Sequence, residues 1–158
     1  MANNTFLSVC SIVLRHKQET GALALHAALQ YSAPEQLIVA LFTVHKAAVK
    51  HRDKNQMLPI HITIRAKYTD QIILLLHNEY TDGSLIADKN GELPLHRAII
   101  SGSSSNVILS ILLVNSSACR QWFSSNKDSL PLNLVFQYSS PLKVVTAVLS
   151  SYSEACKV

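Results

Sequence analysis

Three of the chain's seven histidines could act together, because they recur at one spacing. His26, His61 and His96 are each 35 residues apart, and Asn133 stands 37 residues beyond His96. Imidazoles bind zinc and act as general bases. However, two imidazoles on one zinc ion must each place a nitrogen about 2.0–2.1 Å from it, whereas packed helices lie about 8–10 Å apart. We therefore expect these histidines to bridge backbone groups of neighbouring segments, and we predict no metal site.

Motifs for other catalytic chemistry are missing from the sequence. It contains no Gly-x-Ser-x-Gly elbow and no His-Glu-x-x-His pair, and its four glycines are too few for a phosphate-binding loop. We therefore expect no enzymatic activity and no cofactor. Cys10, Cys119 and Cys156 are odd in number and form no Cys-x-x-Cys pair, so no disulfide framework is predicted. This usage favours a reducing intracellular compartment, with the cytoplasm preferred and an organelle left open.

Basic residues gather in one part of the chain and form a candidate anion-binding patch. Its members are Lys46, Lys50, Arg52, Lys54, Arg65 and Lys67. The first interpretation of such a cluster is a solvated face, and the second is a site for an acidic protein, RNA or an anionic lipid surface. No aromatic side chains alternate with these residues to stack on bases, so nucleic acid is not an expected partner.

The composition favours one folded domain. Of 158 residues, 48% are hydrophobic and only 15% are charged, which excludes a disordered chain. No apolar run approaches the roughly 20 residues that a membrane-spanning helix needs. The low charge suggests that part of the surface is covered by another molecule, and association with a membrane surface or a membrane-bound complex stays open.

A sequence repeat of 35 to 37 residues indicates which segments position the histidines. Four segments share one pattern: 23–26, 58–61, 93–96 and 130–133. An apolar pair follows the last residue of each segment by eleven positions, as at Ile72-Ile73. Turn residues such as Asp88 to Gly91 precede the shared pattern. Each unit therefore contains a turn and two short apolar stretches in one register.

Both apolar stretches are predicted to be helices. Proline falls at the start of the first stretch in three units, a position that requires no backbone N–H donor. The second stretch has helical spacing and start signals: Pro34, Thr69, Ser105 and Ser140-Pro141. No alternation typical of strands competes. The predicted fold class is all-α, with helix-turn-helix units joined by hairpin-like turns.

This pattern resembles the ankyrin repeat, whose signature is a turn, Thr-Pro-Leu-His, a short helix and a second apolar helix with a period of about 33 residues. The stretch from Asp88 to Ala98 carries the likeness best. The resemblance implies a solenoid of stacked repeats in a single domain, 1–158. The repeat limits are a partial leading helix 1–17, then 18–52, 53–87, 88–124 and a degenerate C-terminal repeat 125–158.

The chain departs from the family pattern at several positions. Leucine replaces the family's threonine in all four units, as at Leu93, and Asn133 replaces the last histidine. The segment between the two helices is one residue longer than usual, and the third unit has a longer linker, 115–125. These changes alter the expected loop geometry and leave the expected fold unchanged.

The resemblance implies binding of a protein partner on a concave surface made of turn tips and first helices. The implied turn positions are Lys54, Asn55, Met57, Lys89, Asn90, Glu92, Asn126 and Lys127. The implied helix positions are Gln30, Tyr31, Arg65, Ile100, Ser101, Gln137 and Tyr138. Tyrosine and arginine dominate interface energetics, so Tyr31, Arg65 and Tyr138 are the expected anchors.

The expected function is therefore that of a non-catalytic interaction module or scaffold. Two alternatives stay open at this point. One is a structural accessory subunit of a larger assembly, which the low charge favours. The other is a basic-patch binder of nucleic acid or anionic lipid.

Overall fold

The computed structural model describes residues 24–121 and 130–154, and every regular element among them is helical. The all-α prediction is thus confirmed for this part of the chain. The elements predicted within 1–17 and the turn at 126–128 lie outside the described residues. Four shorter helices are α2 (Ala24–Gln30), α4 (Pro59–Arg65), α6 (Pro94–Ile100) and α8 (Pro131–Gln137). Four longer helices are α3 (Glu35–Val44), α5 (Asp70–Glu79), α7 (Ser105–Val114) and α9 (Leu142–Glu154).

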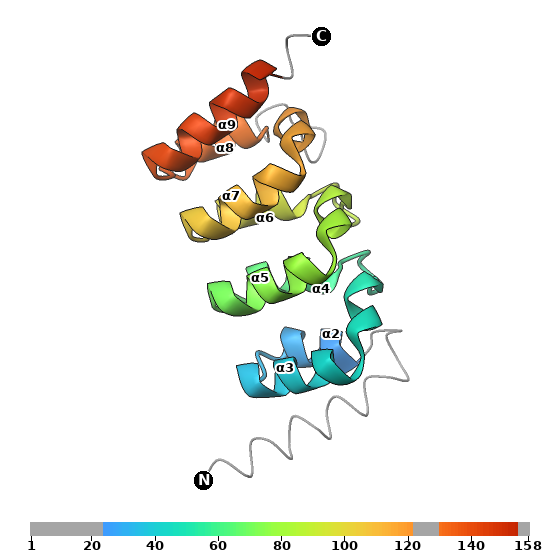
Figure 1. The fold of residues 1–158 in the computed structure, drawn as a ribbon. Helices are drawn as coiled ribbons and strands as arrows, with labels where there is room; N and C mark the ends of the chain where they lie inside the picture. Colours follow the sequence, from blue (N-terminus) through green and yellow to red (C-terminus); the bar gives the residue numbers. More distant parts are fainter. Residues whose placement is uncertain (1–23, 122–129, 155–158) are drawn as a thin grey trace.

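The helices form pairs that stack one upon another from α2–α3 to α8–α9 (Figure 1). Each short helix packs on its longer partner, and the short helices also pack on one another in the order α2, α4, α6, α8. The longer helices α5, α7 and α9 form a second layer in the same order. Each pair contacts its neighbours in the stack, so rigidity comes from the succession of interfaces.

The apolar residues of both layers build a core that runs along the stack. One cluster of buried side chains, including Leu29, Ile38 and Ile62, fills the first interface. A second cluster, including Leu95 and Ile108, continues from α4 to α9. Proline begins α4, α6 and α8 as predicted, because the first turn of a helix leaves its N–H groups without intrahelical acceptors.

Each short helix ends in the same left-handed turn. The residue with positive φ is Ser32, Lys67, Gly102 or Ser139, six positions after the motif His or Asn. The next residue donates its N–H five residues back, as from Tyr68 to the Thr63 carbonyl at 3.2 Å. This geometry is a Schellman motif, which stops the helix and turns the chain toward the longer helix. Lys67 therefore lies in this turn, beyond the last residue of α4.

The longer helices begin close to the predicted start signals, but the capping oxygens expected at Thr69 and Ser105 were wrong. Thr69 stands at the N-cap of α5 but its side chain makes no capping bond; its N–H donates to Glu35 Oε1 of the preceding pair at 3.3 Å. The cap of α7 is Ser104, whose Oγ accepts the Val107 N–H, and Ser105 is the first helical residue. The capping oxygen expected at Ser105 therefore comes from the residue before it.

A 3₁₀ turn follows each of the first three longer helices, and the sequence patterns did not predict it. These turns are η1 (Lys46–Lys50), η2 (Thr81–Leu85) and η3 (Ser116–Arg120). Buried Asn115 holds η3 in place: its side chain accepts the Ala118 N–H at 3.0 Å and donates to the Ser84 carbonyl at 3.0 Å. Consecutive 3₁₀ turns are thereby linked across the stack.

Candidate protein-binding surface

Two tight turns precede α4 and α6 and share one design. Asp53 Oδ1 accepts the N–H groups of Asn55 and Met57 at 2.8 and 2.9 Å. Asp88 Oδ1 accepts the N–H groups two and four residues on at 2.8 and 3.0 Å. An aspartate that satisfies its own turn in this way fixes the backbone without help from neighbouring elements. Both turns are therefore preorganised, which lowers the entropy cost of binding through them.

The two turns are also bonded to each other. The Lys89 N–H donates to the Asn55 carbonyl at 3.0 Å, and Lys89 Nζ donates to Asn55 Oδ1 at 2.5 Å. The turns that precede α4 and α6 therefore form one continuous surface along the stack.

A hollow of about 160 Å³ opens where these turns meet the short helices, and it is called the turn hollow below. Its lining residues are Asn55, Met57, Arg65, Asp88, Lys89, Asn90 and Arg97. Five of these were expected at the surface from the sequence, and the structure brings them together. Asp88 and Arg97 are additional. The hollow combines cationic groups, the Asp88 carboxylate, two amides and the side chain of Met57.

Neither Asp88 nor Arg97 was among the predicted surface residues, although the sequence contains a signal for Arg97. Residues in phase with Arg97 are Ile62, Ala27 and Leu134, all buried and apolar, so a cation at this position is an exception. It forms an ion pair with Glu92, and its Nη2 lies 3.8 Å from Asp88 Oδ2. Burial raises the pKa of Glu92, and the Arg97 charge acts in the opposite direction.

His26 and His96 bond backbone groups of a neighbouring segment, as predicted, whereas His61 bonds only the backbone of its own unit and its Nε2 has no hydrogen-bond partner among the described residues. His96 Nδ1 accepts the Leu93 N–H at 3.1 Å, and Nε2 donates to the Gln121 carbonyl at 2.7 Å. His26 likewise donates to the His51 carbonyl at 2.9 Å, and His61 Nδ1 accepts the Leu58 N–H at 3.2 Å. Each acceptor carbonyl lies 25 residues after its histidine, in the segment that leads to the next unit.

Burial keeps these imidazoles neutral. It lowers the pKa of His61 to about 4, against the opposing effect of the Asp88 carboxylate. Burial also lowers the pKa of His26 and His96. A neutral imidazole that donates through Nε2 and accepts through Nδ1 serves as a rigid brace.

Most residues predicted to bind a partner are accessible. Those exposed are Gln30, Tyr31, Lys54, Arg65, Lys89, Asn90, Gln137 and Tyr138. Asn55, Ile100 and Ser101 are half-buried. The prediction of surface positions was wrong for two residues: Met57 is 3% exposed because it packs into the core, and Glu92 is 9% exposed because it pairs with Arg97. Asn126 and Lys127 lie outside the described residues.

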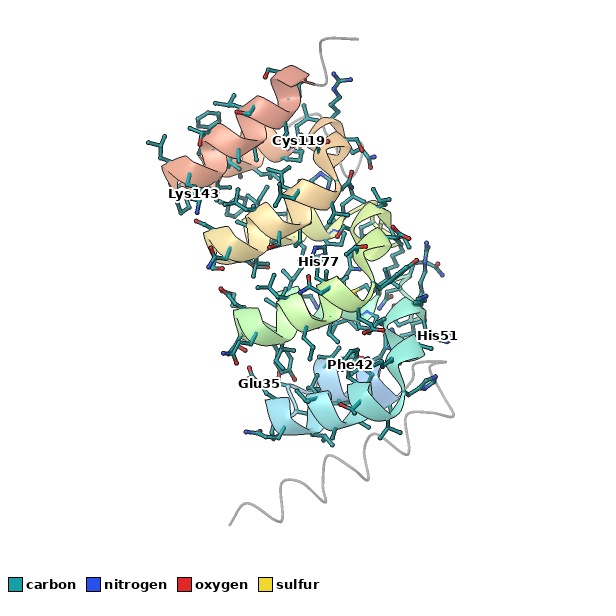
Figure 2. The ribbon with its side chains drawn as sticks, viewed as in Figure 1. Glu35, Phe42, His51, His77, Cys119 and Lys143 are labelled. Atoms are coloured by element: carbon teal, nitrogen blue, oxygen red, sulfur yellow. The ribbon has the colours of Figure 1, made fainter. Side chains whose placement is uncertain are left out.

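The candidate basic patch is divided in space. Lys46 and Lys50 lie in η1, beyond the last residue of α3, while Lys67 adjoins Thr69, which contacts Glu35 at the first residue of α3. Ten helical residues span about 15 Å, so these groups face opposite ends of α3. Figure 2 shows Glu35 at one end of α3 and His51 beyond the other.

Several cations of the patch also have partners within the protein. Lys46 Nζ lies 3.6 Å from Glu79 Oε2, and Lys50 Nζ lies 5.5 Å from the centroid of the Tyr80 ring. Arg52 donates to Gln56 Oε1 at 3.2 Å. These contacts favour the interpretation of a solvated face for η1.

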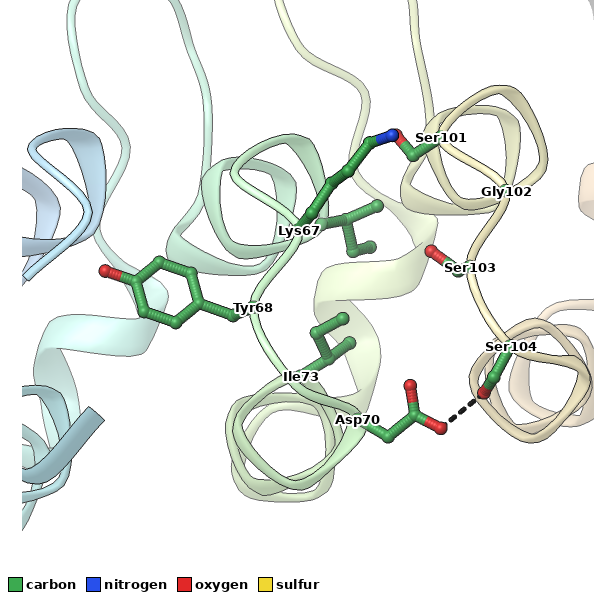
Figure 3. A pocket seen from close by; sticks show the side chains of 9 residues that line it. Lys67, Tyr68, Asp70, Ile73, Ser101, Gly102, Ser103 and Ser104 are labelled. Carbon is green, nitrogen blue, oxygen red and sulfur yellow. Dashed lines mark hydrogen bonds between the residues drawn. The ribbon is translucent and has the colours of Figure 1, made fainter. Parts of the chain in front are cut away.

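A second hollow, of about 220 Å³, lies between the loops that follow α4 and α6. Figure 3 shows Lys67 and Tyr68 on one side of it and Ser101 to Ser104 on the other. Ser104 Oγ donates to Asp70 Oδ2 at 2.5 Å and closes one edge. This second hollow is called the loop hollow below. Lys67 lines the loop hollow and does not line the turn hollow.

The described residues hold no cluster of three or more His, Cys, Asp or Glu side chains that could bind a metal ion. Cys119 is fully buried in the core, and burial raises its pKa to about 11. Cys10 and Cys156 lie outside the described ranges. Among helices in 24–121 and 130–154, none has the length and apolar character to cross a bilayer.

Comparison with known proteins gives no family assignment. The sequence matches no protein-family model, and no curated protein matches it.

Proposed function

We propose that this chain is a non-catalytic protein-interaction module of the ankyrin-repeat type. It binds a protein partner through the turns that precede α4 and α6 and through the exposed ends of the short helices. The observation that carries the proposal is the turn hollow, where preorganised turns from two successive units meet Arg65 and Arg97. Fold alone does not determine function, and this surface is the feature that supports binding of a partner.

The support comes from rigidity combined with accessible anchors. Backbone bonds inside and between the turns hold the polar tips of Asn55, Lys89 and Asn90 in one orientation. Tyr31 and Tyr138 are 44% and 45% exposed at the ends of α2 and α8. Large side chains presented by a stiff support lose little conformational freedom on binding.

The proposal is tested by affinity capture of partners with the tagged chain, followed by calorimetry with the purified partner. The variant Tyr31→Ala/Tyr138→Ala removes two anchors, and Val44→Ala/Leu113→Ala removes exposed side chains from the longer helices. We expect the first double variant to weaken binding at least about tenfold and the second to leave it unchanged. Partners lost only with the second variant would contradict the proposed surface.

A second candidate function is that of a structural subunit in a larger assembly. One observation favours it: Phe136 on α8 is 61% exposed and Leu149 on α9 is 43% exposed, although the residues in phase with them, Ile99 and Leu112, are buried. These two exposed apolar side chains of the α8–α9 pair are called the apolar end face below. A molecule that covered this face would bury it in the way that the α8–α9 pair buries the α6–α7 pair.

A further inference from the structure

We infer that the turn hollow binds carboxylate side chains, so that the partner presents an acidic peptide segment. This inference depends on the proposed function, because it specifies the chemistry of the partner at the same surface.

Positive charge that the protein leaves uncompensated lines the hollow. Arg65 is exposed at the last residue of α4 and forms no hydrogen bond or ion pair with the residues that the structure describes. Lys89 is also exposed, and the side-chain oxygen that it contacts belongs to the neutral amide of Asn55. Both cations therefore remain available to a ligand.

The carboxylate already in the hollow does not cancel this charge for a ligand. Asp88 is 7% exposed, and its Oδ1 is occupied by two backbone N–H groups of its own turn. Its Oδ2 faces Arg97, which Glu92 also neutralises. The acidic groups are thus committed to the turn and to Arg97. Arg65 acts on the Glu92 carboxylate electrostatically but forms no ion pair with it, and Lys89 forms no ion pair with the described residues.

The size and lining of the hollow suit an acidic side chain. A volume of about 160 Å³ equals roughly five waters of liquid, enough for a carboxylate with its methylene groups. Met57 supplies an apolar floor, and the amides of Asn55 and Asn90 supply further donors. Charge-assisted bonds from guanidinium and ammonium groups to a carboxylate are about twice as strong as neutral ones.

Nucleic acid fits this lining less well than a peptide. Among the residues that the structure describes, no aromatic side chain lines the hollow to stack on a base. The lysines of η1, which would extend a track for a phosphate backbone, already contact Glu79 and the Tyr80 ring. An acidic protein segment is therefore the favoured occupant.

The test measures fluorescence anisotropy of a labelled peptide that alternates Glu and Ala, at constant ionic strength. Its controls are the same peptide with Gln in place of Glu, and a single-stranded uridine oligomer. Arg65→Gln and Lys89→Gln each remove one cation from the hollow. Lys143→Gln removes one cation from the exposed start of α9, far along the stack, and is the matched control (Figure 2).

We expect the Glu peptide to bind at least about tenfold more tightly than the Gln peptide. Each hollow variant should weaken the Glu peptide about tenfold, and Lys143→Gln by less than about twofold. Equal losses for Lys143→Gln and Arg65→Gln, absence of binding, or tighter binding of the uridine oligomer would overturn the inference. Captured partners that need the two tyrosines but tolerate Arg65→Gln would also overturn it, while leaving the proposed function in place.

Discussion

At the scale of single residues, His96 connects the helix start of one unit to the segment entering the next, and His26 and His61 each make one of these two kinds of bond. The bond from a backbone N–H to Nδ1 requires a neutral imidazole, because Nδ1 accepts a hydrogen bond only when it carries no proton. Burial enforces that state and lowers the pKa of each imidazole below 6.5. Stability should therefore depend on pH.

The direction of this dependence follows from proton uptake. Below pH 6.5 the unfolded chain binds a proton at residue 61 that the folded chain does not bind until about pH 4. His61 alone should thus lower the free energy of unfolding by about 3 kcal/mol across this range, with no effect above pH 7. Urea unfolding at about pH 7 and pH 4.5 measures the loss. In His61→Asn, the difference between the two pH values should be smaller, and an equal difference would contradict the assignment.

The ion pair of Glu92 and Arg97 is a second feature at this scale. The in-phase residues 35 positions earlier are Met57 and Ile62, which are buried and apolar. One unit thus uses an apolar pair where the next uses a charged one. Because burial is the largest influence on the Glu92 pKa and raises it, desolvation outweighs the attraction of Arg97.

This comparison predicts that the effects of substituting Glu92 and Arg97 on the free energy of unfolding are strongly non-additive. The double variant Glu92→Met/Arg97→Ile should leave the free energy of unfolding unchanged or raise it, because it copies the pair of the preceding unit. Glu92→Met alone should lower it by about 1–3 kcal/mol, because Arg97 loses one of its two carboxylate partners and keeps only Asp88. A double-mutant cycle from denaturant unfolding gives both values. If the double variant were less stable than the single one, the two units would not share a packing arrangement.

At the scale of the elements, helix termination depends on one residue per unit with positive φ. Only one of the four described examples is glycine, Gly102 at 67°; Lys67 adopts 56° with a side chain that left-handed backbone disfavours. A Cβ added at Gly102 would meet no atom within 4 Å. Any cost of substitution there is therefore a backbone cost.

Two opposite substitutions test this account. Gly102→Ala should lower the free energy of unfolding by about 1 kcal/mol, and Lys67→Gly should raise it by about 0.5–1 kcal/mol. Urea midpoints at unchanged slope report both changes. Ser103→Gly, one residue beyond the left-handed position, is the control and should not stabilise. A destabilised Lys67→Gly would indicate that the lysine side chain has a structural role in the loop hollow.

At the scale of the whole molecule, stability accumulates across interfaces between helix pairs. The apolar end face of α8–α9 differs from the other interfaces, because among the described residues no further helix pair packs on it. Phe136 is 61% exposed, whereas Ile99 and Ile64 in phase with it are 1% and 0% exposed.

Replacement by serine should therefore affect the free energy of unfolding differently at Phe136 and at Ile99. Phe136→Ser should change the free energy of unfolding by less than about 0.5 kcal/mol, and it should reduce both hydrophobic-dye binding and self-association. Ile99→Ser should cost at least about 3 kcal/mol, because it opens a cavity and buries a hydroxyl group. Thermal unfolding and dye fluorescence measure both variants. Strong destabilisation by Phe136→Ser would show that this face is packed in solution.

Much of the architecture was predictable because local signals recur in register. Prolines at helix starts, apolar spacing and capping residues are properties of short segments, so the sequence by itself determined the all-α class and most helix limits. The same register also shows Arg97 as a charged residue at a position that is apolar in the other units.

The remaining features depend on contacts between units, which no single segment encodes. Tertiary structure decided that Met57 and Glu92 are inside, since burial is set by the neighbouring pair. It separated Lys67 from Lys46 by the length of α3, because a left-handed turn reverses the chain after Arg65. It also brought Arg65 next to Lys89 across one stacking interface, 24 positions apart in the chain, and thereby created the turn hollow.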